Sequence, residues 1–170
     1  MLRPRRGDDP RVRGLSLRAS GLLFRLLLCR SCTTFGAILG GPGALAEECG
    51  GADSKEFSEA FAELEKSGLV EADWQNRICF VTFVPEDDPP VNENMAKGRG
   101  RAVGDLPDCN LRRKIVAEIL KHAGPWADEF SKAAANFGGV DTDEEPQEDE
   151  PEGTVSKPFG NRSGTVRRPS

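Results

Sequence analysis

The segment between residues 53 and 90 constrains the fold of this chain more than any other. Apolar side chains recur there at helical spacing, at Phe57, Phe61 and Leu64. This pattern predicts an amphipathic helix. Asp53 is suited to cap its start and Gly68 to end it, because an aspartate side chain accepts backbone N–H bonds and glycine readily adopts the left-handed conformation.

Two runs of β-forming residues follow this helix. Residues 69–73 and 77–84 predict strands, and residues 74–76 predict the short hairpin connection between them. The sequence then breaks at two aspartates and two prolines, residues 87–90. A helix, a glycine stop and a hairpin form the second half of a winged helix-turn-helix, so an α+β fold is expected.

The residues before position 53 supply the remaining parts of such a fold. Ser16 is placed to cap a helix over residues 17–29, and Pro42 suits the first turn of a second helix that reaches residue 49. Residues 35–39 predict a third, short strand. The sequence therefore predicts three helices and a small sheet with a wing, within a winged-helix domain that covers residues 14–90.

The remaining segments differ in composition from this domain. Residues 1–13 predict a basic, disordered lead-in, and residues 91–137 a basic connector followed by C-terminal helices. Within the connector, three glycines between residues 96 and 104 weaken the expectation of a helix. Asp108 is expected to cap the next helix, and Pro125 to open the last one. Residues 138–170 are acidic, aperiodic and interrupted by proline and glycine, which predicts a disordered tail.

Charge is distributed unevenly along the 170 residues, whose formal net charge is −5. Arginine is concentrated in residues 1–30, and acidic residues in 141–152. Any contact with nucleic acid is therefore expected to be local. No apolar run approaches the roughly 20 residues that a membrane-spanning helix needs. We expect a cytoplasmic protein without membrane contact, and an amphipathic helix rather than a signal peptide around residues 17–29.

Five cysteines are scattered along the chain, and two of them, Cys29 and Cys32, form a C-x-x-C pair. A zinc site needs a second pair of ligands at similar spacing, which the sequence lacks. The odd number favours reduced cysteines that pack as small apolar side chains. No nucleophile, base and orienting group can be assigned from the pattern. We therefore expect no enzyme, no cofactor, no metal and no small-molecule substrate.

Several motifs in this order are similar to those of one protein family. They are the segments 9–16, 43–47 and 59–71 and, most specifically, Asp88-Pro89-Pro90-Val91-Asn92-Glu93-Asn94 followed by Lys97. Together they resemble phage-type replication proteins with an N-terminal winged helix, of the replisome-organiser or helicase-loader kind. The resemblance covers residues 9–124. It implies a phage or prophage protein that binds DNA in replication and recognises an origin or recruits a helicase.

The predicted recognition helix, between Asp53 and Gly68, carries four glutamates and two lysines, so phosphate groups would repel it. DNA contacts are expected instead on nine basic residues: Arg11, Arg13, Arg18, Lys97, Arg99, Arg101, Arg112, Arg113 and Lys114. The alternative hypothesis is a protein–protein interaction module that docks through its acidic third helix without binding DNA, for example to another replication protein.

Overall fold

The computed structural model describes residues 8–50 and 53–136. The chain divides into two units, residues 1–140 and 141–170, and every described residue belongs to the first. The predictions for residues 1–7, for Phe137 and for the acidic tail, residues 138–170, lie outside the described residues.

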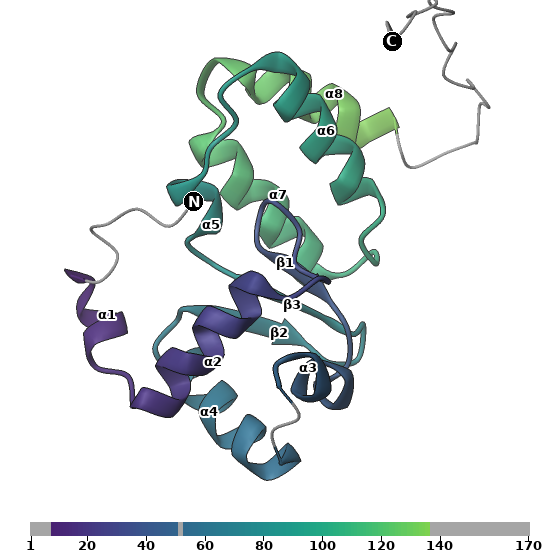
Figure 1. The fold of residues 1–170 in the computed structure, drawn as a ribbon. Coiled ribbons are helices and arrows are strands. Elements are labelled where there is room, and N and C mark those ends of the chain that lie inside the picture. The colour runs from purple at the N-terminus through teal and green to yellow at the C-terminus, as the bar shows by residue number, and fades with distance from the viewer. Residues whose placement is uncertain (1–7, 51–52, 137–170) are drawn as a thin grey trace, which may run out of the picture. The chain divides into compact units, whose positions relative to one another are not determined.

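The described residues form eight α-helices, one short 3-10 helix and three strands, which confirms an α+β architecture (Figure 1). In chain order they are α1 (Pro10–Arg13), α2 (Leu17–Leu28), β1 (Ala37–Leu39), α3 (Pro42–Glu48), α4 (Ser54–Lys66), β2 (Val70–Asp73), β3 (Ile78–Val81), α5 (Val84–Asp87), α6 (Glu93–Gly104), α7 (Asn110–His122), the 3-10 helix Gly124–Trp126 and α8 (Ala127–Asn136).

The three strands form one antiparallel sheet in the order β1-β3-β2. Strand β3 is central: Ile38 of β1 and Ala72 of β2 both lie opposite Cys79. The short third strand expected in residues 35–39 is therefore confirmed as β1. The sheet is small, and helices cover both of its faces.

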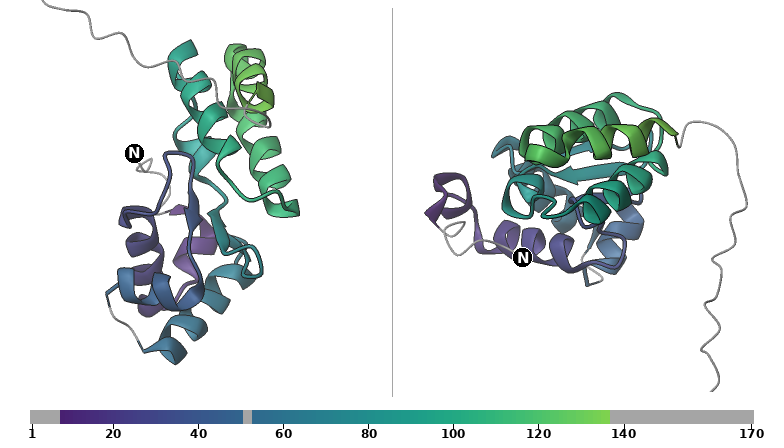
Figure 2. Two further views of the ribbon diagram at one scale, coloured as in Figure 1. Left: turned by 90° about the vertical axis from the view of Figure 1, so that its right-hand side faces the viewer. Right: turned by 90° about the horizontal axis from the view of Figure 1, so that it is seen from above.

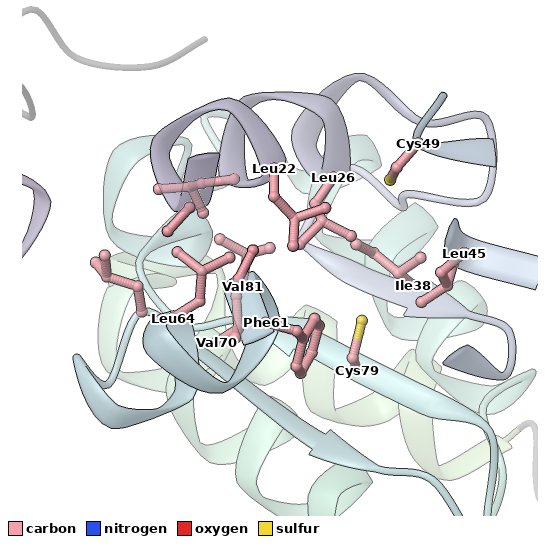
Figure 3. Packing of buried hydrophobic residues seen from close by; sticks show 14 of the residues in the cluster. Leu22, Leu26, Ile38, Leu45, Cys49, Phe61, Leu64, Val70, Cys79 and Val81 are labelled. Carbon is pink, nitrogen blue, oxygen red and sulfur yellow. The ribbon is translucent and has the colours of Figure 1, made fainter. Parts of the chain in front are cut away.

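Alternation along β3 divides the interior into two apolar clusters, because successive strand side chains point to opposite faces. Cys79 and Val81 belong to the cluster formed with α2, α3 and α4 (Figure 3). Ile78 and Phe80 belong to the cluster formed with α6, α7 and α8. Figure 2 shows these two groups of helices on either side of the strands. The boundary expected at residue 90 therefore does not separate the C-terminal helices from the sheet.

Most helix ends lie where local chemistry predicts them. Ser16 Oγ accepts a hydrogen bond from the backbone N–H of Ala19 at 3.1 Å, and Asp53 Oδ1 accepts one from Lys55 at 3.1 Å. Gly68 follows the end of α4 with a φ of +70°, a conformation that costs glycine little.

Two expectations near the hairpin and the connector are corrected. The strand predicted over residues 77–84 ends at Val81 and is followed by α5. Pro85 has no backbone N–H and therefore favours the first turn of α5 over a longer ladder. The glycine-rich stretch that includes residues 96–104 forms a regular helix, α6, which Asn92 caps by accepting a hydrogen bond from Met95 at 2.8 Å.

Two further boundaries differ from the predictions. Helix α7 is capped by Cys109 rather than Asp108, since Cys109 Sγ accepts from the backbone N–H of Arg112 at 3.5 Å. The last four residues of the expected disordered lead-in form α1, whose N-terminus is capped by Asp9. Local preference favours aspartate over cysteine as a cap, so the tertiary structure, not local preference, sets the start of α7.

Candidate interaction surface

The two arginines of the N-terminal segment that the structure describes before α2, Arg11 and Arg13, are paired with nearby carboxylates. Arg11 Nη2 lies 2.8 Å from Asp9 Oδ2, and Arg13 contacts Asp8. Exposed pairs of this kind contribute little to stability, but they offset the positive charge that a phosphate would meet.

Helix α4 directs carboxylates of its acidic face at α2. Arg18 of α2 lies 3.2 Å from Glu56 and 3.9 Å from Glu59. Glu63 accepts hydrogen bonds from the backbone N–H of Ser16 at 2.5 Å and from its hydroxyl at 2.7 Å. Three of the four glutamates of α4 therefore contact α2, although the side chains of Glu56 and Glu59 remain 50% and 59% exposed.

The bonds from Ser16 have a measurable electrostatic consequence. The backbone N–H of Ser16, and after it the hydroxyl, lower the pKa of Glu63 because both stabilise the ionised carboxylate. A carboxylate whose pKa is lowered by folding stabilises the fold above the ordinary glutamate pKa of about 4.3, and this contribution is lost as the pH falls through the folded pKa.

We expect Glu63→Gln to lower the thermal unfolding midpoint at neutral pH by on the order of a few degrees, because a neutral amide accepts these bonds less strongly. The difference from wild type should disappear in acid, where Glu63 is protonated in both states. Thermal unfolding followed by circular dichroism across pH measures this. Glu65→Gln is the matched control: burial raises the pKa of Glu65, so removing its charge should not lower the neutral-pH midpoint. A Glu63→Gln deficit that persists in acid would contradict the assignment.

The basic residues of α6 occupy three different environments. Lys97 contacts Glu93 and lies 3.6 Å from Glu129 of α8. Arg101 is exposed, and no carboxylate of the described residues lies within ion-pair distance. Arg99, by contrast, is buried.

The burial of Arg99 corrects its assignment as a DNA contact. Its side chain is only 2% exposed, its Nη2 lies 2.8 Å from Asp88 Oδ2, and its Nη1 donates to the Asp88 carbonyl. Burial lowers the pKa of Arg99, while the Asp88 carboxylate acts in the opposite direction. The guanidinium faces the interior and the connector before α6, where no phosphate can reach it.

The three DNA contacts predicted on α7 each interact with a different part of the chain. Arg112 donates to the Leu106 carbonyl at 3.3 Å, and Lys114 lies 2.6 Å from Glu71 of β2. Arg113 is exposed and lies 4.0 Å from Asp108.

One hollow brings two of the nine predicted residues together. Arg11 and Lys114 both line a cavity of about 450 Å³ beside β2, β3 and α7. Three glutamates line it as well, Glu71, Glu86 and Glu118. Its charges are mixed, so it lacks the uniform positive potential that binding a nucleic-acid backbone requires.

The cysteines lie within or against the apolar cores. Cys49 and Cys79 are buried, and Figure 3 shows them among the apolar side chains of the α2–α4 cluster. Burial raises the pKa of Cys32 to about 12 and that of Cys49 to about 11. These thiols remain protonated at neutral pH, which disfavours nucleophilic chemistry. Within residues 8–50 and 53–136, no group of three or more His, Cys, Asp or Glu is arranged to hold a metal ion.

The most unusual surface feature is an apolar row on the exposed side of α2. It consists of Leu17, Gly21, Phe24 and Leu28, which are spaced at i, i+4, i+7 and i+11. Leu17 is 91% exposed, Phe24 57% and Leu28 68%. The opposite side of the helix supplies Ala19, Leu22, Leu23 and Leu26 to the core. Aligned exposed apolar side chains of this size are characteristic of interaction surfaces, so we call these four residues the α2 row.

A hollow of about 220 Å³ lies between α2 and α4 beside the α2 row. Leu17 and Gly21 belong to both the row and the hollow, and Phe57 and Ala60 of α4 contribute further apolar lining. Arg25 also lines it and donates to the Cys49 carbonyl at 2.9 Å. Arg18 and Glu56 line the hollow too and pair with each other at 3.2 Å, so the apolar surface has an edge with both basic and acidic side chains, on which Arg25 is not paired with a carboxylate of the described residues.

Comparison with known proteins identifies no relative. No family model, curated protein or solved structure matches this chain. Function must therefore be inferred from the chemistry of the surface. None of the helices in the described part of the chain has the length and apolarity to cross a bilayer.

The α2 row was not predicted from the sequence, although a signal for it exists. Helix α2 has the sequence LRASGLLFRLLL, with no acidic residue and only two arginines. A helix that covers a core on one side normally carries a polar opposite face. Apolar residues around most of the circumference therefore indicate a second contact surface, which the structure locates at the α2 row.

Proposed function

We propose that this chain is a non-enzymatic protein-interaction module that docks a partner through the α2 row. One observation carries the proposal: three large apolar side chains of one helix face are exposed beside a hollow between α2 and α4. Burial of such side chains is favourable by roughly 25 cal/mol per Å² of apolar surface, before the costs of association.

We further propose that the scaffold is a winged helix. Its support is the order of elements: three helices, α2 to α4, precede the hairpin β2–β3, and β1 completes the sheet. The resemblance of the sequence to phage-type replication proteins adds to this proposal, since an interaction module in such a protein would recruit another component. The proposed docking surface differs from the acidic third helix expected from the sequence, because that helix directs most of its glutamates at α2.

Direct DNA binding is the second candidate, favoured by the exposure of Arg101 and Arg113. The described residues nevertheless include 16 basic and 20 acidic ones, and most of the predicted DNA contacts are paired with carboxylates. Phosphate affinity depends on uncompensated positive charge, so this balance favours the interaction module.

A selection from displayed helical peptides tests the proposal. Helix-forming peptides are selected for binding to the full-length chain, and survivors are tested against the Phe24→Glu variant. We expect binders whose affinity falls at least about tenfold on this change, since a charge replaces a central apolar contact. Gln75→Glu, an exposed change in the hairpin, is the control.

Binders that are insensitive to Phe24→Glu, or the absence of binders, would contradict the proposal. Fluorescence anisotropy with single- and double-stranded oligonucleotides across a salt series tests the second candidate. Steeply salt-dependent binding that is lost in Arg101→Glu/Arg113→Glu would favour DNA binding instead.

A further inference from the structure

We propose that the partner of the α2 row is an acidic amphipathic helix, whose apolar face covers the row while its carboxylates face Arg25 and Arg30. This inference rests on the proposed function and specifies the chemistry of the partner. Three properties of this surface identify the partner: the length of the α2 row, the notch at Gly21 and the charge of the surrounding side chains.

The length of the row suits a helix. Leu17 and Leu28 are eleven residues apart on one helix, a span of roughly 16 Å at 1.5 Å per residue. A partner helix of three to four turns matches this length and presents apolar side chains at the same i, i+4, i+7 and i+11 spacing.

Gly21 creates a notch in the middle of the row. A Cβ atom added to Gly21 would meet no atom within 4 Å, and Gly21 itself lines the hollow between α2 and α4. A leucine or phenylalanine of the partner can enter this space between Leu17 and Phe24, with Phe57 and Ala60 beneath it. Anchors of this kind, inserted into a preformed pocket, supply most of the affinity in helix-in-groove complexes.

Charge selects an acidic partner. Helix α2 has no acidic residue. Arg25, one turn after Gly21, and Arg30, beyond the C-terminal end of α2, are both exposed, and neither has a carboxylate of the described residues within ion-pair distance. Arg30 interacts with Glu48 at longer range and contributes to lowering the pKa of that carboxylate. Carboxylates on the partner would complement these two guanidinium groups and disfavour basic competitors.

The same charges argue against a second copy of this chain as the occupant. Pairing of two α2 rows would bring the arginines of two cationic helices together, while Glu56 of α4, the glutamate that lines the hollow, is already paired with Arg18. Like charges across an interface are unfavourable, so the surface is better suited to a different, acidic helix.

Three fluorescein-labelled peptides of about 18 residues, five turns of helix, test this inference on the full-length chain. The first carries leucines at i, i+4, i+7 and i+11 with flanking glutamates. The second has lysine in place of every glutamate, and the third has the composition of the first without its helical period. Anisotropy titrations should show the first binding at least about tenfold more tightly than the others.

Two variants separate shape from charge. Gly21→Leu fills the notch and should weaken the acidic peptide about tenfold, although leucine favours the helix more than glycine does, so a folding defect is not expected. Arg25→Gln/Arg30→Gln should reduce the difference between the acidic and basic peptides. Thermal unfolding of each variant verifies that it is folded.

Three results would overturn the inference. They are equal binding of the acidic and basic peptides, acidic binding unaffected by Gly21→Leu, or Phe24-dependent self-association in sedimentation velocity without peptide binding. If the displayed selection still yields Phe24-dependent binders that are not acidic, the proposed function stands and only the partner chemistry is wrong. If the selection yields no Phe24-dependent binder, both the inference and the proposed function are wrong.

Discussion

Gly100→Ala is expected to destabilise the fold by about 2 kcal/mol, whereas Gly98→Ala on the same helix should stabilise it by about 1 kcal/mol. A Cβ atom on Gly100 would lie 2.6 Å from the carbonyl oxygen of Phe130 and 2.8 Å from Ala133 Cβ, both in α8. These are atoms of a packed helix, so α6 and α8 would have to separate. Gly98 meets nothing within 4 Å and gains only the helix propensity of alanine.

Urea denaturation monitored by circular dichroism measures both changes. Because the two substitutions are chemically identical and two residues apart, the difference between them isolates the contact between α6 and α8 from the effect of removing a glycine. A Gly100→Ala variant as stable as Gly98→Ala would show that the two helices do not approach each other this closely. The unfolding slope should remain that of the wild type, since neither change alters the surface exposed on unfolding.

Asp88→Asn is expected to destabilise the fold by about 2 to 3 kcal/mol, because it leaves the buried Arg99 guanidinium without its counter-charge. Breaking a fully buried ion pair costs about 3 to 5 kcal/mol. We expect a smaller loss here because the Asp88 side chain is 40% exposed and water offsets part of it. The Arg99 guanidinium already lacks one hydrogen bond, because its Nε is buried and has no partner among the described residues.

Removal of the arginine instead of the aspartate should reduce the free energy of unfolding less. Arg99→Met removes the buried charge and keeps much of the apolar stem, and the remaining Asp88 carboxylate can be hydrated. Arg101→Met is the matched control on the same helix and should change the free energy of unfolding by no more than about 0.5 kcal/mol. Urea denaturation of the single and double variants tests the pair. An Asp88→Asn change as small as the control would mean that the pair does not hold the connector to α6.

Local chemistry predicted much of the architecture. Ser16, Asp53 and Gly68 act at helix ends as their side chains and backbone preferences dictate, and residues 37–39 join the sheet as the expected third strand. Each of these assignments depends on neighbours within a few residues. The helix over Glu93–Gly104 was not predicted because its glycines are unfavourable in isolation, and only packing against α8 gives Gly100 a function.

The candidate surface was predicted less well than the fold. Basic residues were identified from the sequence, but their neutralisation by Asp9, Glu56 and Glu71 depends on how the chain folds. The sequence by itself determined the α+β class, the helices α2, α3 and α4 and the hairpin, since spacing and capping act over short distances. Only the tertiary structure decided that Arg99 is buried, that α4 directs three of its four glutamates at α2, and that Phe24 faces solvent. Burial and charge pairing arise between segments distant in sequence, which a local pattern does not encode.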